Sequence, residues 1–233
     1  MATTLRAAII GAGSIAQAAH INAFRSVPDV ELVALCDTNK ERVQQVASEH
    51  SIPETYTDYR RMLRKVKPDL AVVCTPNALH ARMTIDALKA GAHVLCEKPM
   101  ALTYRDAMNM VDTSQKENRS LTVGFCLRHG PDAIAAKQKV VTGDLGNVYY
   151  VKASLLRRSG IPGYGSWFTN KDLAGGGAMM DIGCHVTDLS LYLMGHPKPV
   201  AVTAMTFANF GPKGIGLGTW GADHFPPPAR CDV

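Results

Sequence analysis

The stretch LRAAIIGAGSIAQAAH (residues 5–20) decides the fold of this chain. An apolar run leads into GAGSIA (residues 11–16), which fits the pattern G-x-G-x-x-G/A, and a helix-like stretch follows. The pattern is weak alone, but it is typical of a dinucleotide-binding turn when a strand precedes it and a helix follows. Gly11 then allows a tight turn, Gly13 lets the main chain approach a pyrophosphate, and the helix start offers N–H groups to the phosphates. The residues expected to line this part of a dinucleotide are Gly11, Gly13, Ser14 and Ile15.

Strand-like and helix-like stretches alternate beyond this turn, as in a series of β-α-β units. The expected strands are almost continuously apolar and cover residues 6–10, 30–36, 69–74, 92–96 and 121–126. The expected helices cover residues 14–26, 40–50, 58–66, 78–90 and 103–118. Strands of this kind belong to parallel sheets that are covered on both faces. We therefore predict an α/β Rossmann domain, a doubly wound parallel sheet, over residues 1–126.

An acidic residue stands at the end of the second expected strand. Asp37 follows VELVALC (residues 30–36), and a carboxylate at this place accepts hydrogen bonds from the ribose hydroxyls of a dinucleotide. A carboxylate also repels the 2′-phosphate of NADP, so we expect NAD as the cofactor and NADP as the less favoured one. Lys40 and Arg42 follow closely and soften that preference. The alternative is a plain glycine turn with a surface aspartate at a strand end.

Polar residues follow two more strands, and ligands of open α/β sheets bind beyond the carboxyl ends of the strands. Thr75-Pro76-Asn77 comes after one strand, and Glu97-Lys98-Pro99 comes after another. Asn77 is also a suitable N-cap for the following helix. Lys98 is the unusual residue, because it follows an apolar strand and precedes a proline. It either holds a substrate hydroxyl and stabilises charge as a proton leaves, or forms an ion pair with a carboxylate such as Glu97.

The second candidate for chemistry is GGGAMMDIGCHVTDL (residues 175–189). Asp181, His185 and Asp188 recur at helical spacing, away from the apolar face of the same helix. Asp181 precedes His185 by one turn, where a carboxylate can fix the imidazole tautomer and keep its pKa near neutrality. His185 is then a candidate to take the proton of a substrate hydroxyl, and Gly183 leaves room for a ligand. The alternative is an acidic first turn beside a histidine without a chemical role.

The pattern changes near residue 128, and we predict a second, α+β domain over residues 127–233. Its expected elements are a helix (131–142), a strand (147–157), a helix (179–194) and a strand (199–208). A loop rich in glycine and aromatic residues lies between the first strand and the second helix. Aromatic residues in such a loop line a pocket about as often as they pack. The candidates for substrate contacts are Arg128, Tyr164 and Trp167.

Composition and charge exclude several classes of protein. The net charge is +5, and the basic run between Arg60 and Lys67 lacks interleaved aromatic residues, so we expect a solvated helix face and no nucleic acid partner. No apolar run reaches the ~18 residues of a membrane span, so no membrane partner is expected. None of the six cysteines forms a CxxC pair, and no metal site is expected. Four cysteines are expected to be buried free thiols, and they are Cys36, Cys74, Cys96 and Cys126. Free thiols are typical of a reducing compartment, so we expect a cytoplasmic location.

Taken together, these segments resemble the Gfo/Idh/MocA family of NAD(P)-dependent oxidoreductases (glucose–fructose oxidoreductase, inositol dehydrogenase and rhizopine catabolism). The combination of EKP with GGG-x(3)-D-x-G-x-H is the specific part of the resemblance. The matching segments stand in family order from residue 6 to about 195, and they are GAGSIA (11–16), CD (36–37), CTPNALH (74–80), CEKPMALT (96–103) and GGGAMMDIGCHVTDL (175–189).

The resemblance implies roles for these residues. Lys98, Asp181 and His185 match the family's catalytic trio: His185 would be the acid/base at the carbinol, Asp181 would orient it, and Lys98 would bind the reacting oxygen. Hydride would pass between the substrate carbon and nicotinamide C4. A cis peptide bond is expected before Pro99, and the second domain would hold an open, mostly antiparallel sheet. The positions that match cofactor-lining residues are Thr75, Pro76, Asn77, His80, Glu97 and Lys98.

The sequence also departs from the family pattern. Many members carry Trp-Arg ahead of the glycine run, whereas this chain has Trp167-Phe168. Members usually continue well beyond this length, so we expect a chain that holds about half of the second domain. The function expected is hydride transfer to or from a sugar, inositol or sugar derivative, by a homo-oligomer (dimer or tetramer) when full length. The alternatives are an NAD-retaining redox glycosidase or lyase and a catalytically incompetent nucleotide-binding fragment.

Overall fold

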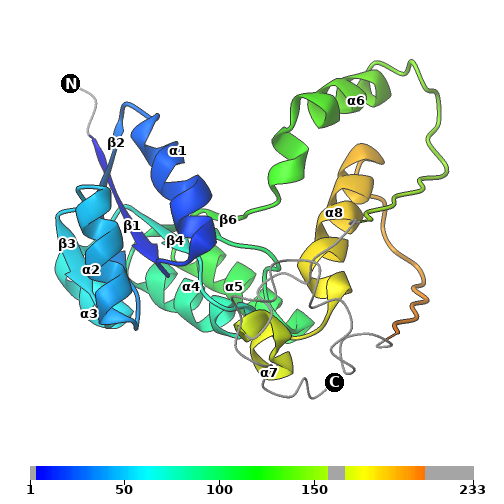
Figure 1. The fold of residues 1–233 in the computed structure, drawn as a ribbon. Helices are drawn as coiled ribbons and strands as arrows, with labels where there is room; N and C mark the ends of the chain where they lie inside the picture. The colour runs from blue at the N-terminus through cyan, green and yellow to red at the C-terminus, as the bar shows by residue number, and fades with distance from the viewer. Residues whose placement is uncertain (1–3, 157–165, 208–233) are drawn as a thin grey trace. The chain divides into compact units, whose positions relative to one another are not determined.

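The computed structural model describes residues 4–156 and 166–207 of the chain. The chain divides into two compact units, which are residues 1–124 (unit 1) and residues 125–233 (unit 2). We describe each unit by itself (Figure 1).

Unit 1 is built on a six-stranded sheet in which all strands are parallel. The strand order is β3-β2-β1-β4-β5-β6. β2 and β3 therefore extend the sheet on one side of β1, and β4, β5 and β6 extend it on the other. This order is that of a Rossmann sheet. The strands are β1 (Leu5–Ile10), β2 (Val30–Cys36), β3 (Glu54–Tyr56), β4 (Leu70–Val73), β5 (His93–Cys96) and β6 (Leu121–Val123).

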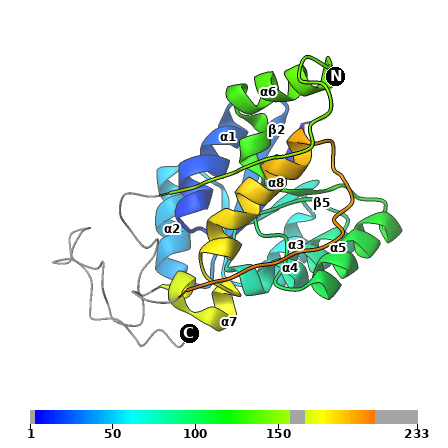
Figure 2. The same cartoon turned by 90° about the vertical axis from the view of Figure 1, so that its right-hand side faces the viewer.

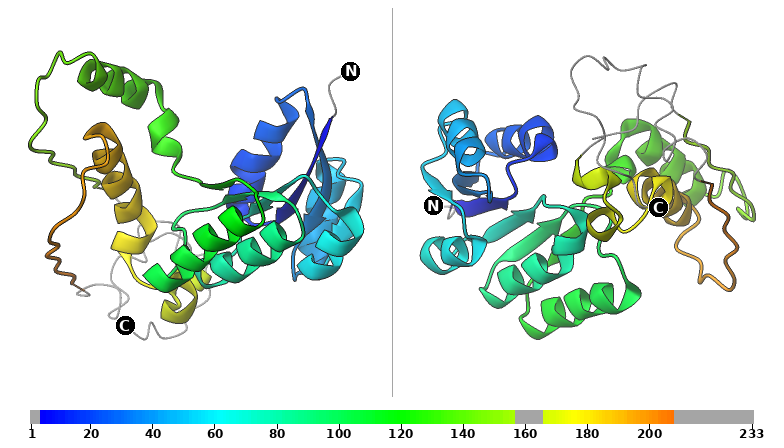
Figure 3. Two further views of the ribbon diagram at one scale, coloured as in Figure 1. Left: turned by 180° about the vertical axis from the view of Figure 1, so that it is seen from behind. Right: turned by 60° about the horizontal axis from the view of Figure 1, so that its bottom comes forward.

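Helices cover both faces of this sheet (Figure 2 and Figure 3). One face carries a π-helical turn (Ala16–His20) that continues into α1, together with α2. The other face carries α3, α4 and α5, and a 3₁₀ turn (Asn77–Leu79) leads into α4. The helices are α1 (Ile21–Arg25), α2 (Lys40–Glu49), α3 (Tyr59–Val66), α4 (His80–Lys89) and α5 (Tyr104–Lys116).

Local sequence sets where three of these helices begin. The side chains of Asn39, Asp58 and Thr103 each accept a hydrogen bond from a main-chain N–H in the first turn of α2, α3 and α5. A capping side chain of this kind satisfies an N–H that has no partner within the helix, which typically stabilises the helix by ~1 kcal/mol.

The core of unit 1 follows the alternation of side chains along its strands. On β1, Ala8 and Ile10 pack against α3, α4 and α5, whereas Ile9 packs with α1 and α2 on the opposite face. All three side chains are at most 2% exposed. Successive side chains of a strand point to opposite faces, so an apolar strand fills both layers.

The expected elements of unit 1 are confirmed, with three differences. The short strand β3 was not expected, because its three residues (Glu54–Tyr56) carry one aromatic and no aliphatic side chain. The last strand, β6, ends at Val123 and not at the expected residue 126. Cys126 therefore lies beyond it, in a 3₁₀ turn (Cys126–His129), and is exposed, so its expected burial was wrong. Cys36, Cys74 and Cys96 are buried free thiols, as expected. The third difference is the π-helical geometry of residues 16–20.

The described part of unit 2 consists of helices and irregular segments. Its helices are α6 (Pro131–Val141), α7 (Lys171–Ala174) and α8 (Cys184–Leu193), with a 3₁₀ turn (Trp167–Thr169) before α7 and a π-helical turn (Met179–Gly183) before α8. None of these helices, nor those of unit 1, combines the length and apolar character that a membrane crossing needs within the described residues.

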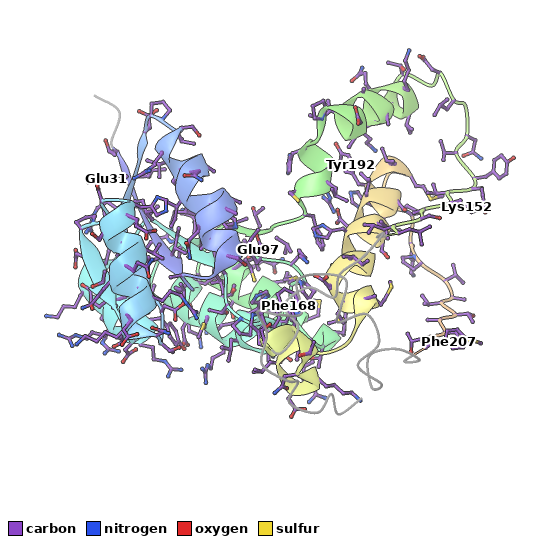
Figure 4. The ribbon with its side chains drawn as sticks, viewed as in Figure 1. Glu31, Glu97, Lys152, Phe168, Tyr192 and Phe207 are labelled. Atoms are coloured by element: carbon purple, nitrogen blue, oxygen red, sulfur yellow. The ribbon has the colours of Figure 1, made fainter. Side chains whose placement is uncertain are left out.

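The two strands expected in unit 2 are not formed in the described residues. Residues 147–156 and 199–207 carry no strand hydrogen bonding. Lys152 and Phe207 lie on these two segments (Figure 4). The β-branched and aromatic side chains that predicted strands are present, but a strand exists only when its N–H and C=O groups pair with a second strand. Here neither segment pairs with another part of the described chain.

Candidate functional site

The loops that carry the candidate residues of unit 1 leave the sheet at one edge. Gly11 follows β1, Asp37 follows β2, Thr75 follows the end of β4, and Glu97 follows β5. Because all strands are parallel, their carboxyl ends lie at the same edge. Between β1 and β4 the strand order reverses, and ligands of open α/β sheets bind at such a point.

The glycine turn has the geometry that the sequence predicted. Gly11 has φ +104°, and a Cβ at this position would lie 2.5 Å from the carbonyl oxygen of Cys74. Glycine is therefore required at residue 11 by both conformation and space. A Cβ at Gly13 would meet nothing within 4 Å, and Ser14 and Ile15 are exposed. The turn is thus tightly packed at Gly11 and open at Gly13, where a phosphate would approach.

Asp37 braces the glycine turn. Its Oδ2 accepts a hydrogen bond from the Ala12 N–H (2.9 Å), and its Oδ1 accepts one from the Asn39 N–H (2.9 Å). The Arg42 guanidinium lies 3.5 Å from Oδ2 and its side chain is half-exposed. A carboxylate oxygen has about two acceptor positions, so Oδ1 has one left for a ribose hydroxyl, while Oδ2 already faces both the Ala12 N–H and Arg42.

The loop after β4 presents Thr75, Pro76 and Asn77. The Thr75 hydroxyl oxygen is buried and has no hydrogen-bond partner among the described residues. A buried polar atom without a partner is costly, and it points to a missing partner in the space it faces. Asn77 is 6% exposed and is the first residue of the 3₁₀ turn that leads into α4. The expectation that it is the N-cap of the following helix was therefore wrong, because Pro76 holds that position for the turn and Leu79 holds it for α4.

His80 lies behind these loops, which corrects the expectation that it lines the cofactor. The side chain is 1% exposed, so it leaves no surface for a ligand. Its Nδ1 is 2.8 Å from the carbonyl oxygen of Pro99, and its Nε2 is 2.9 Å from that of Thr75. Burial lowers the pKa of His80, although the two carbonyl contacts act in the opposite direction. His80 therefore ties the loop after β4 to the loop after β5.

Glu97 and Lys98 follow β5, and the peptide bond between Lys98 and Pro99 is cis, as the resemblance implied. The Glu97 carboxylate is held by His20 Nε2 at 2.7 Å and by the Lys98 main-chain N–H at 3.1 Å. Burial raises the pKa of Glu97, but the contacts with His20 and Lys98 outweigh it and leave the pKa below its ordinary value. Glu97 is labelled in Figure 4.

The candidate residues of unit 2 stand on the π-helical turn and on α8. Asp181 lies in the turn Met179–Gly183, and His185 lies in the first turn of α8. The Cys184 N–H donates to the Met179 carbonyl, which is the i+5 spacing of a π-helix and not the i+4 spacing that the sequence predicted. The His185 ring meets the Phe125 ring edge-on, with centroids 6.3 Å apart.

Gly183 has a different role from the one expected. The space above its Cα is filled, because a Cβ there would overlap the sulfur of Met179. The expectation that a ligand approaches at Gly183 is therefore corrected in this structure: a side chain of its own helix occupies that place.

Arg128 makes a two-pronged ion pair with Asp188. Its Nε donates to Asp188 Oδ2 at 2.6 Å, and its Nη2 donates to Oδ1. The guanidinium also lies 5.3 Å from the ring centroid of Tyr192, which Figure 4 labels on α8. These contacts place Arg128 in the packing of unit 2, and a substrate contact from it stays a prediction.

The loop before α7 holds the other two candidates for substrate contact. The Trp167 ring stacks on the Phe168 ring, with centroids 3.9 Å apart, and both side chains are half-buried. Tyr164 lies outside the described residues. A substrate contact from either residue stays a prediction.

Two neighbours of Glu97 were missed by sequence reasoning: His20 contacts its carboxylate, and Gly124 leaves the space beside it that a side chain would fill. Asp188 was noted on the helix face with Asp181 and His185, but its pairing with Arg128 was not expected. The contacting residues are 77 positions apart for His20 and Glu97 and 60 for Arg128 and Asp188. Spacing in one sequence carries no signal for pairs so distant.

A Rossmann sheet with a glycine turn, an aspartate directly after the second strand and polar residues at further strand ends is typical of a dinucleotide-binding protein. The family models narrow this class. The chain belongs to the Gfo/Idh/MocA family: the model for an oxidoreductase family with an NAD-binding Rossmann fold matches residues 5–125, and the model for the family's C-terminal domain matches residues 133–222.

Three similar proteins illustrate the family. The D-glucoside 3-dehydrogenase of Escherichia coli K12 is 41% identical over 93% of this chain and 62% of its own. The inositol 2-dehydrogenase of Salmonella typhimurium LT2 is 29% identical over 69% of this chain and 48% of its own. The structure of levoglucosan dehydrogenase in complex with NADH and levoglucosan has a TM-score of 0.72 at 29% identity, over 82% of this chain and 54% of that one. The chain thus spans between 48% and 62% of the length of these relatives.

Proposed function

We propose that this chain carries the cofactor site and the proton-transfer residues of an NAD-dependent oxidoreductase that acts on a carbinol of a sugar, inositol or related polyol. One observation carries the proposal. The glycine turn, Asp37, Thr75 and Lys98 stand at one edge of the parallel sheet, in a chain whose relatives include glucoside and inositol dehydrogenases. These relatives' names support the substrate class.

The residues of unit 1 fit a dinucleotide. The open face of Gly13 has room for a pyrophosphate, and the Thr75 hydroxyl lacks a partner that a bound ligand would supply. Asp37 favours a ribose with free hydroxyls over a 2′-phosphate, because a second anion beside a carboxylate is repelled. NAD is therefore the proposed cofactor, and when bound it takes the hydride of the carbinol carbon.

The chain's own residues would handle the oxygen and its proton. Lys98 would donate a hydrogen bond to the reacting oxygen and stabilise negative charge that develops on it. His185 would take the hydroxyl proton during oxidation and return it during reduction. Asp181 would hold the His185 ring in one orientation and favour its protonated form. These three roles are those that the family resemblance implied.

Substitution of His185 by alanine tests the proposal. We expect NADH formation from a panel of polyols and sugars to fall at least ~10²-fold, the loss typical of a missing general base. NAD binding, measured by calorimetry, should stay the same, because the cofactor residues lie in unit 1. His129→Ala is the matched control, since His129 is exposed in the same unit and should leave both quantities unchanged. Near-normal turnover of His185→Ala would overturn the role given to His185.

A further inference from the structure

The main chain at Lys98 is held by a buried contact that starts on a different element. The His20 and Glu97 side chains are 12% and 13% exposed, and His20 Nε2 lies 2.7 Å from Glu97 Oε1. The other carboxylate oxygen of Glu97, Oε2, accepts the Lys98 N–H at 3.1 Å. His20, Glu97 and the backbone of Lys98 therefore form one connected chain of hydrogen bonds.

The position of the Glu97 carboxylate is fixed on a third side by β6. A Cβ added to Gly124, just after β6, would lie 3.2–3.3 Å from the carboxylate atoms. This is closer than side chains normally pack, so any side chain at residue 124 would crowd the carboxylate. With His20 on one oxygen, Lys98 on the other and Gly124 beneath, Glu97 has little freedom to turn toward a cofactor.

The charge state of Glu97 strengthens these contacts. Burial raises its pKa, but the contacts with His20 and with Lys98 outweigh burial, so the pKa lies below its ordinary value. Glu97 is therefore ionised at neutral pH. A hydrogen bond to a carboxylate is about twice as strong as one between neutral groups.

The π-helical turn is what brings His20 to this place. The Ile21 N–H donates to the Ala16 carbonyl, five residues back, so the turn from Ala16 to His20 is wider than an α-helical one. His20 is the last residue of that turn. The turn begins three residues after Gly13, so the glycine turn leads almost directly into the element that carries the residue contacting Glu97.

We propose that His20 is a positioning residue for Lys98: it acts through Glu97 and fixes the main chain from which the Lys98 side chain projects. The inference deepens the proposed function, and it rests on that function only for the role of Lys98 in the reaction. A shift of the Lys98 backbone by an ångström would move its amine away from the reacting oxygen, and a misplacement of this size costs up to ~10²-fold in rate.

The test compares His20→Ala, His20→Gln and Glu97→Gln with a matched control, His93→Gln. The control histidine begins the same strand, β5, at the opposite edge of the sheet, and its Nδ1 accepts the Ser120 N–H. We expect His20→Ala to lower kcat at least ~10-fold with little change in the KM for NAD. His20→Gln keeps an N–H donor and should restore most of the rate, and His93→Gln should leave it unchanged.

A second readout needs no turnover. Each variant is treated with an amine-reactive reagent, and labelling of Lys98 is measured by mass spectrometry relative to Lys89, which is exposed at the end of α4. We expect the ratio to change in His20→Ala and Glu97→Gln and to return toward wild type in His20→Gln. Equal ratios in all variants would overturn the inference, even if His20→Ala is less stable.

The two readouts separate this inference from the proposed function. If no polyol or sugar is oxidised by the unsubstituted chain while the labelling ratio still responds to His20, the proposed function fails and the positioning role stands. If the chain is active but neither kcat nor the ratio responds to His20→Ala, the positioning role fails and the proposed function stands.

Discussion

The two units of this chain are stabilised in different ways. Unit 1 has a sheet covered on both faces, and it holds nearly all apolar side chains that are buried in the described residues. In the described part of unit 2, only Ala133 and Ala174 are buried apolar residues. Large apolar side chains are exposed there instead, and they include Leu145, Tyr149, Tyr150, Leu156, Val200, Val202, Met205 and Phe207.

The difference teaches how the candidate residues of each unit are held in place within that unit. The residues proposed to hold the cofactor stand on strands whose positions are set by close packing. Asp181 and His185 stand on a helix whose position depends on polar contacts, chiefly the Arg128–Asp188 pair and the hydrogen bond from Lys137 Nζ to the Tyr192 carbonyl. Three experiments with substituted chains test how each unit is stabilised.

The largest effect is expected from the same substitution made once in each unit. Ile21 on α1 is 0% exposed, and Ile134 on α6 is 54% exposed. Ile21→Ala should lower the free energy of unfolding by about 2–5 kcal/mol, because it leaves a cavity. Ile134→Ala should change it by less than about 0.5 kcal/mol, as for most surface sites. Urea unfolding measures both, and similar losses would contradict the contrast between the units.

An intermediate effect is expected from Arg128→Met. The substitution removes both hydrogen bonds to Asp188, which is buried, and should destabilise unit 2 by about 1–3 kcal/mol. Hydrogen exchange locates the loss: amides of α8 should exchange faster, while those of α4 keep their protection. Unchanged protection of α8 would mean that the ion pair does not hold this helix.

The smallest effect is expected from the pH dependence of His80. Its pKa is lowered in the folded chain, chiefly by burial, so the unfolded chain takes up the proton first as the pH falls. Stability is therefore lost as the pH drops below the unfolded pKa of ~6.5, by less than about 1 kcal/mol between pH 7 and pH 6.

His80→Gln removes this titration. The loss of stability between pH 7 and pH 6, measured by urea unfolding, should be smaller in the variant than in the wild type. His93→Gln serves as the control because His93 is exposed. An identical pH slope in wild type and His80→Gln would show that the buried ring does not titrate differently in the two states.

The sequence predicts unit 1 well because its signals are local. Five of the six strands are apolar runs that can be read directly along the sequence. β3 was missed because three residues are too few to show a pattern. The strands expected at 147–157 and 199–208 were predicted from composition, and composition cannot supply the second strand that each needs.

The sequence predicted which residues lie at one edge of the sheet, but it predicted less well which side chains contact each other. Strand ends placed Gly11, Asp37, Thr75 and Lys98 at one edge, as the structure has them. His80 was expected to face the cofactor, yet it lies buried behind two loops, because a motif gives the order of residues and not their direction. The contact between His20 and Glu97 joins two distant parts of the chain, which no periodicity encodes.

The two π-helical turns allow the chain to hold one residue more without turning the helix faces on either side. A π-helical turn accommodates one residue more than an α-helical turn. Deleting one residue from Ala16–His20 would therefore return the turn to α-helical spacing and leave the side chains on either side close to their present directions. The same holds for Met179–Gly183 and His185. An alignment with a relative whose turn is α-helical therefore needs a gap inside the helix, because without it each residue beyond the turn is paired with one that points about 100° away.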